Sequence, residues 1–247
     1  SLAAAFKAIG NGGGRCGLLL PDLAMRVNVL NFETLPQKSK EREALIRWRI
    51  KESLGFAPEE SRISWQVLHT QPGLIELLVV AAKNDVLAEY EAALDSRSGI
   101  SLILPVTCAL LPLLPDTERG GQILTHVCSG GVTHAVVEGK RLRLWRSRRL
   151  AQPELDGGAA EVISEAARAA ASARDRLKLQ ITKAWLCTRP LRGDEFRNAL
   201  ERELGLPVEN LAWDGNLGNA LDPGEKPLFH PFGAPVAGLI ANSGRSL

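Results

Sequence analysis

The stretch from Gly121 to Arg146 has the residue types and spacing that come nearest to a nucleotide-binding site. One apolar run predicts a strand over 123–127, four small residues predict a sharp corner, and a second apolar run predicts a strand over 133–137. Glycines allow main-chain N–H groups to approach an anion closely, so such a corner can hold a phosphate. The candidate phosphate contacts are Ser129, Gly130, Gly131 and Thr133.

Two other chemistries are conceivable at the same corner. His126, Cys128 and His134 are metal-ligand types, but a structural zinc site uses four ligands and no fourth is evident. A nucleophilic serine of the Gly-x-Ser-x-Gly type needs a strand-to-helix turn, whereas Ser129 is followed by another strand. We therefore expect packed histidines, no metal and no nucleophile.

A strongly basic strand follows the corner, with six cations in the ten residues 140–149. Leu142 and Leu144 alternate with arginines, which predicts one basic face. Such a strand is either a charged sheet edge that resists aggregation or a contact for anionic lipid head groups or an acidic partner. Nucleic acid is not expected, because Trp145 alone could stack on bases. The candidate patch is Arg141, Arg143, Arg146 and Arg149.

The elements that would position these residues belong to a mixed α/β chain. Residues 17–104 predict the order strand, strand, helix, strand, strand, helix, strand. Further along, a long alanine-rich helix over 159–180, a strand over 181–188 and a helix over 193–204 are predicted. A closing helix over 234–242 carries Gly238, which we expect to face a close neighbour. The expected inner face of the long helix is Val162, Ile163, Ala166, Ala170, Ala173 and Leu177.

The composition limits which partners and which cellular environments we expect for this protein. The 247 residues carry a net charge of +2, so the overall charge gives no reason to expect a nucleic acid or membrane partner. Four scattered cysteines without a CxxC motif are expected to be reduced. The uncharged run 100–114 is too short to span a bilayer and contains two prolines, so we expect no transmembrane segment.

Four segments together resemble PilM-like type IV pilus assembly proteins of the actin-like ATPase superfamily. They are 19–27 (LLPDLAMRV), 40–48 (KEREALIRW), 78–90 (LVVAAKNDVLAEY) and 237–241 (AGLIA). The likeness covers nearly the whole chain and is best between residues 17 and 112. The cytoplasmic domain of GspL-type secretion proteins is similar to a lesser degree.

The resemblance implies an actin-like, ribonuclease H-like fold of two lobes, truncated at its N-terminus. The first lobe would span residues 1–110 with a PilM-type extra subdomain at about 25–94, and the second would span 111–247. Each lobe would hold a mixed sheet covered by helices.

The departures from that family concern the nucleotide. Actin-like ATPases place a carboxylate on the hairpin strand before the second phosphate loop, where it serves Mg²⁺ and the attacking water. Here no Asp or Glu lies between Arg119 and Val137, and Val127 falls where the acid belongs. Residues 186–190 replace the glycine pair of the adenosine-binding turn with bulkier residues. The first phosphate loop would lie upstream of Ser1.

The resemblance and its departures together imply a non-catalytic pseudo-ATPase without a cofactor. The protein would be a cytoplasmic scaffold, peripheral to the inner membrane, in a type IV pilus or type II secretion platform. Its partner would be a bitopic PilN-like membrane protein, bound through a cytoplasmic peptide beside the extra subdomain, with an assembly or secretion ATPase as a second candidate partner. The alternative is an active ATPase that binds ATP and Mg²⁺ with Gly130, Gly131 and Thr133 and with residues upstream of the chain.

Overall fold

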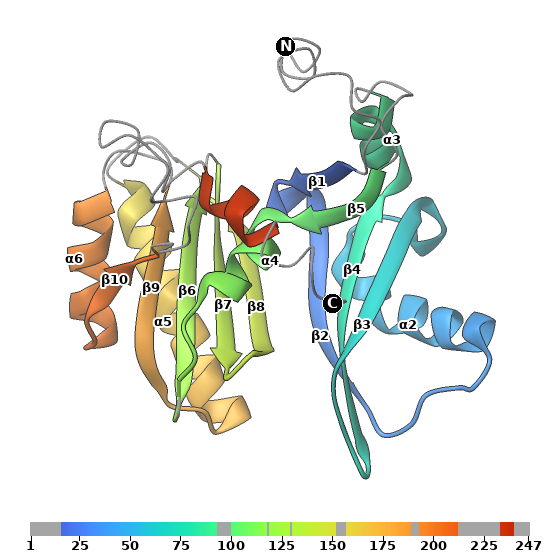
Figure 1. Ribbon diagram of the computed structural model, residues 1–247, viewed down its shortest axis with the longest axis horizontal. Helices are drawn as coiled ribbons and strands as arrows, with labels where there is room; N and C mark the ends of the chain where they lie inside the picture. The colour runs from blue at the N-terminus through green and yellow to red at the C-terminus, as the bar shows by residue number, and fades with distance from the viewer. Residues whose placement is uncertain are drawn as a thin grey trace.

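The computed structural model describes residues 16–92, 100–117, 119–128, 130–151, 157–188, 193–211 and 233–239. These residues form three β-sheets and the helices that cover them (Figure 1). A five-stranded sheet with its helices makes one side of the molecule, and a three-stranded sheet with α2 makes the other.

The five-stranded sheet is mixed. Its first three strands in sequence pair as antiparallel hairpins, and the two later strands add in parallel on the other side. In spatial order the strands are β10 (Val208–Asn210), β9 (Ile181–Thr188), β6 (Gly121–Cys128), β7 (Gly131–Glu138) and β8 (Arg141–Arg149). The strand over 181–188 was predicted with these bounds.

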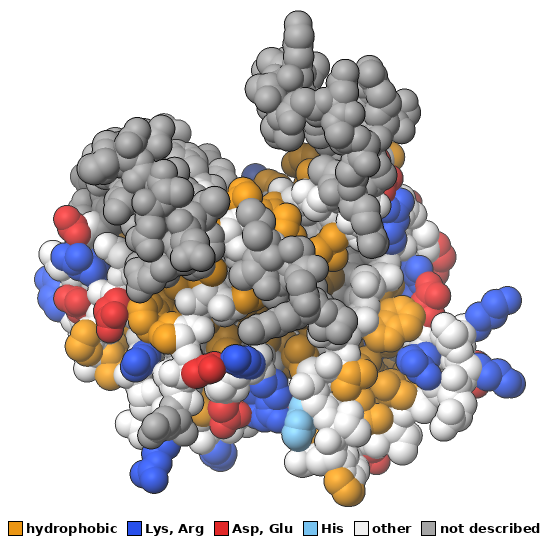
Figure 2. Space-filling model, in the orientation of Figure 1, with side chains coloured by type: hydrophobic (Ala, Val, Ile, Leu, Met, Phe, Trp, Pro, Cys, Tyr) orange, Lys and Arg blue, Asp and Glu red, His pale blue; other side chains and the backbone are white. Residues whose placement is uncertain are grey.

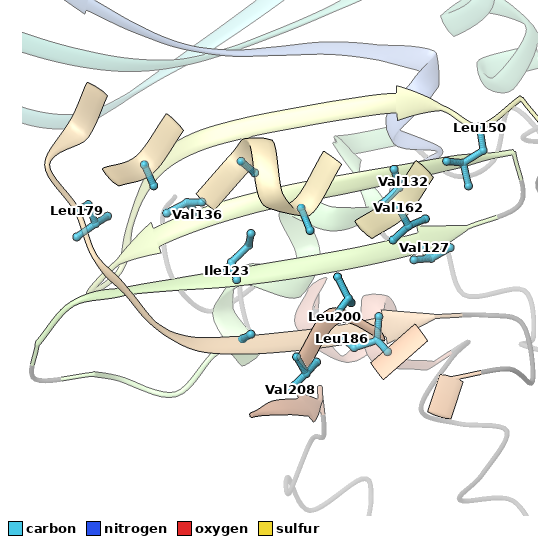
Figure 3. Close-up of a cluster of buried hydrophobic side chains, with 14 residues drawn as sticks. Ile123, Val127, Val132, Val136, Leu150, Val162, Leu179, Leu186, Leu200 and Val208 are labelled. Carbon is cyan, nitrogen blue, oxygen red and sulfur yellow. The ribbon is translucent and has the colours of Figure 1, made fainter. Parts of the chain in front are cut away.

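Both faces of this sheet are covered, which explains why β6 and β7 are buried almost end to end. Helices α5 (Gly157–Leu177) and α6 (Gly193–Leu204) pack on one face through branched side chains that interlock with alanines (Figure 3). The short helix α4 (Val106–Leu110), the turn η3 (Leu111–Leu113) and the helix at 233–239 cover the other face.

The three-stranded sheet is antiparallel, in the order β2 (Met25–Phe32), β4 (Leu74–Lys83), β3 (Ser61–Gln71). Helix α2 (Ser39–Leu54) covers one face, where its apolar stripe meets the odd-numbered residues of β4. Gly55, with φ of 75°, ends α2 in the left-handed conformation predicted for a C-terminal glycine.

A two-stranded parallel sheet lies beside this unit. It pairs β1 (Cys16–Leu20) with β5 (Ile100–Pro105), and α3 (Asn84–Ala92) comes before β5 in the chain. The first lobe therefore differs from our expectation of one mixed sheet, because β1 and β5 do not join β2–β4–β3. The lobe boundary at residue 110 stays a prediction.

Two details of side-chain orientation were predicted wrongly. The buried face of α5 contains Glu165 and Ala169, while Ile163 and Ala170 are only partly buried. In β8 a bulge interrupts the pairing with β7, so that Val136 faces Leu144 and Val137 faces Leu142. Leu142 and Leu144 therefore lie on opposite faces of the sheet, and the strand has no single basic face.

The prediction for Gly238 is confirmed. A Cβ atom at this position would lie 1.7 Å from the carbonyl oxygen of Ala109, so only glycine allows the helix at 233–239 to approach α4.

Candidate functional site

The glycine corner between β6 and β7 is closed by packing. Gly130 adopts φ of 79° in the turn, which favours glycine. A Cβ atom on Gly131 would lie 2.6 Å from Cδ1 of Leu23, which belongs to the short helix η1 (Asp22–Ala24). Leu23 thus packs against the main chain that a phosphate loop would leave open. Ser129 lies outside the described residues.

The hydroxyl of Thr133 is also engaged within the fold. Its Oγ1 is 2.9 Å from Oγ of Ser147 on β8, and Thr133 is buried. At the expected adenosine turn, Leu186 and Cys187 are buried in the cores on either face of the sheet, while residues 189–192 lie outside the described part. The contacts recorded for these nucleotide-loop positions are structural ones.

A buried polar network joins η1, α4 and β6. The carboxylate of Asp22 accepts the main-chain N–H of Thr107 at 2.9 Å and also the Thr107 hydroxyl. That hydroxyl lies 2.7 Å from Nδ1 of His126. Burial raises the pKa of Asp22, but the hydrogen bond and charge of His126 and the bonds from Thr107 outweigh burial and leave this pKa below its usual value. The network ties the two sides of the molecule together.

The two histidines of the hairpin lie on opposite faces of the sheet. His126 lies on the α4 side, whereas His134 shares the α5 side with Thr125, whose Oγ1 is 3.1 Å from Nδ1 of His134. Two ligands on opposite faces cannot reach one metal ion, so the pair has no shared site.

Most of the arginines predicted to form an anionic-partner patch are paired within the chain. Arg141 and Arg143 both reach Glu76, a buried residue of β4, at 3.3 and 3.8 Å, and both also pair with Glu138 at the end of β7. Arg146 pairs with Glu165 of α5 at 3.2 Å.

Arg149 differs from these three. It is exposed, and no carboxylate partner is found for it among the described residues. The structure therefore separates the predicted patch into three paired cations and one that is available to solvent.

An apolar groove lies between the uncovered face of β3–β4 and the α4–η3 segment, with a volume of about 560 Å³. Figure 2 shows hydrophobic side chains in the hollow between the two sides of the molecule. Lys140 and Asp116 form an exposed ion pair of 3.3 Å near the same segment. The apolar lining includes Leu68, Leu78, Val80, Leu111, Leu113 and Leu142.

Sequence reasoning missed the two buried glutamates and the residues that line this groove. Glu76 interrupts an apolar strand and Glu165 interrupts an apolar helix stripe, so each was visible as a charge in a position expected to be buried. The groove had no such signal, because the residues that line it come from segments far apart in the chain.

Comparison with known proteins gives the fold a name. No protein-family model and no curated protein matches the sequence. A chain of the PilM–PilN type IV pilus biogenesis complex is similar in structure, with a TM-score of 0.66 and 18% identity over 93% of this chain and 80% of that chain. A Bacteroides thetaiotaomicron protein with an actin-like ATPase fold and unknown function matches 79% of this chain and 68% of its own, with a TM-score of 0.51 and 10% identity. The chain has an actin-like ATPase fold.

The similarity confirms the actin-like fold class that the resemblance implied, whereas the bounds of the two lobes stay a prediction. At these sequence identities the similarity establishes the fold alone. No helix within the described ranges is long and apolar enough to cross a membrane.

Proposed function

We propose that this protein is a non-hydrolysing scaffold of a type IV pilus or type II secretion assembly platform. It would act in the cytoplasm at the inner membrane and bind a short cytoplasmic peptide of a PilN-like membrane protein. The observation that carries this proposal is the similarity of fold, over 93% of the chain, to a chain of a complex that contains PilM and PilN.

The apolar groove is the proposed peptide site. It lies beside the β2–β4–β3 unit, next to which the resemblance implied a peptide contact, although α2, which was also expected to contribute, does not line it. Several of its apolar side chains are only partly buried. Apolar side chains of an extended peptide would cover this surface, and a few such anchors normally supply most of the affinity of an interface.

The nucleotide corner supports a scaffold over an ATPase. The hairpin carries no carboxylate between Arg119 and Val137 that could serve Mg²⁺. Leu23 packs on Gly131, and the Thr133 hydroxyl is bonded to Ser147. We propose that this corner now serves packing between η1 and the sheet.

A matched pair of variants on β3 tests the peptide site. Leu68 lies at the irregularity of β3 and lines the groove, whereas its neighbour Val67 is 52% exposed and does not line it. In a calorimetric titration with a synthetic peptide of the PilN-like cytoplasmic segment, Leu68→Glu should weaken binding by about tenfold or more, because it places a charge in the apolar contact. Val67→Glu should leave the affinity within about twofold.

Thermal melts of both variants separate a lost contact from a lost fold. Equal peptide affinity in Leu68→Glu and the unaltered protein, with both folded, would place the peptide elsewhere. Absence of binding by the unaltered protein at millimolar peptide would contradict the proposed function itself.

A further inference from the structure

A second cleft lies where the two sides of the molecule meet. Strands β2 and β8 are the outer strands of their respective sheets and are neighbours across the junction (Figure 1). The cleft between them has a volume of about 560 Å³ and shares no lining residue with the apolar groove. Its lining includes Arg26 and Asn28 of β2, and Arg146, Ser147, Arg148 and Arg149 of β8.

Positive charge is in excess around this cleft. Four arginines and one carboxylate, Glu165, line it, which leaves a formal charge of +3 among the lining residues. Glu165 is also shared, because it pairs with Arg146 at 3.2 Å, with Arg148 at 2.8 Å and with Arg168 at 2.7 Å. Burial raises the pKa of Glu165, but pairing with these arginines outweighs burial and leaves this pKa below its usual value. The carboxylate therefore stays ionised, and its charge is already shared among the three arginines.

Two arginines, one on each wall, have no carboxylate partner within the described ranges. Among the described residues, the guanidinium of Arg26 hydrogen-bonds to the main-chain carbonyls of Leu23 and Met25, both at 3.3 Å. Arg149 is exposed on the opposite wall. Both arginines line the same cleft, where their like charges repel and a bound anion would relieve that repulsion.

Polar groups on both walls add unused hydrogen-bonding capacity. The side-chain nitrogen Nδ2 of Asn28 on β2 and Nε of Arg146 on β8 are buried, and no described residue accepts a hydrogen bond from either. Buried donors are normally paired, so these two nitrogens lack the partner that such groups usually have. A site of this composition fits a ligand that is negative and carries only acceptor atoms.

We propose that the cleft between β2 and β8 binds a phosphate group. Guanidinium groups bind the oxygens of phosphate in pairs, and several arginines can surround one dianion. The volume exceeds what inorganic phosphate alone would fill, so the phosphate would belong to a larger molecule. Its source is either a soluble phosphate ester or a phospholipid head group.

Two probes distinguish these sources. Pyrophosphate is titrated by calorimetry in 0.15 M salt, where the screening length of about 8 Å suppresses weak surface binding. Vesicles of phosphatidylcholine, with and without phosphatidylglycerol, are tested by co-sedimentation. Binding of pyrophosphate supports a soluble phosphate ligand, and binding only to vesicles that contain phosphatidylglycerol supports a lipid head group.

Three charge variants decide whether the cleft is responsible. Arg149→Glu and Arg26→Gln change opposite walls, and each should weaken binding by about tenfold or more. Arg176→Glu is the control, since Arg176 is exposed near the end of α5, eleven residues or about 16 Å beyond Glu165 along the helix.

Either of two results would show that this cleft is not a phosphate site. The proposal is overturned if neither probe binds, or if Arg176→Glu weakens binding as much as Arg149→Glu. All three variants are expected to fold, and a thermal melt of each checks this before binding is compared. Because the peptide groove and this cleft share no lining residue, the Leu68→Glu variant should bind the phosphate probe normally.

Discussion

His134 is a buried imidazole that is kept neutral by its surroundings. It is fully buried on the α5 side of β7, where Thr125 is its hydrogen-bond partner. Burial lowers the pKa of His134 from 6.5 to about 4, with Glu165 acting to raise it and Arg146 acting to lower it. An unfolded chain has no such burial, so the folded and unfolded states take up this proton at different pH.

The protein should therefore lose stability in mild acid. The unfolded chain binds the His134 proton near pH 6.5 and the folded protein only near pH 4, so the stabilisation is present above this window and is lost as pH falls through it. By pH 5 the loss from this residue is about 2 kcal/mol. Urea denaturation at pH 7.5 and pH 5 measures it.

The pKa of Asp22 is lowered in the folded protein, so this residue also makes the protein less stable in acid. Matched histidine variants separate the contribution of His134 from that of Asp22. His134→Gln should reduce the loss between pH 7.5 and pH 5, whereas His69→Gln, on the partly exposed end of β3, should not. An unchanged pH dependence in His134→Gln would mean that this imidazole titrates normally.

Single residues were the least predictable feature. The sequence marked Gly130, Gly131 and Thr133 as phosphate contacts only under the ATPase alternative, and it gave no sign that Gly131 meets Leu23 or that Thr133 bonds to Ser147. The Asp22–Thr107–His126 network joins positions 104 residues apart, and no local pattern marks such a contact. A charged residue inside an apolar run was the one available signal. Applied to Glu165, this signal would have predicted a buried charge that needs partners.

At the scale of elements, local signals predicted most boundaries. Helix α6 and strand β9 match their expected ranges because glycine signals and apolar periodicity agree there. The bulge in β8 was not predictable, since no glycine or proline marks it. The expected buried face of α5 did not include Glu165, which three arginines allow to be buried.

The helix at 233–239 offers a test of element packing. In Gly238→Ala the new methyl group would meet the Ala109 carbonyl, so the helix must move away from α4. We expect a loss of about 2–3 kcal/mol of unfolding free energy, in the range found for overpacked sites. Val236→Ala on the same helix is the control, since Val236 is 50% exposed and should change stability by about 0.5 kcal/mol or less. Equal stability of the Gly238→Ala and unaltered proteins would contradict the close approach.

At the scale of the whole molecule, a buried carboxylate joins the two sheets. Glu76 is 3% exposed on β4, and it meets Arg141 and Arg143 from β8 of the other sheet. A buried charge without its partner is costly, so this contact favours one relative placement of the two sides. The same junction holds the phosphate cleft, with the apolar groove lined by other residues.

The overall architecture was predictable because several segments resembled one family along most of the chain. The junction was not, because it depends on which charges meet between sheets that are separate in sequence. Glu76 and Arg141 are 65 positions apart, and neither has a motif.

ATP turnover is the most direct measurement of whether this actin-like chain is a scaffold or an enzyme. Phosphate release from Mg-ATP should equal that of buffer alone, because the hairpin lacks a carboxylate for the metal. Thr133→Val, which removes the hydroxyl bonded to Ser147, is measured beside it to identify contaminating activity. Magnesium-dependent turnover that disappears in Thr133→Val would contradict the scaffold proposal and establish a working ATPase.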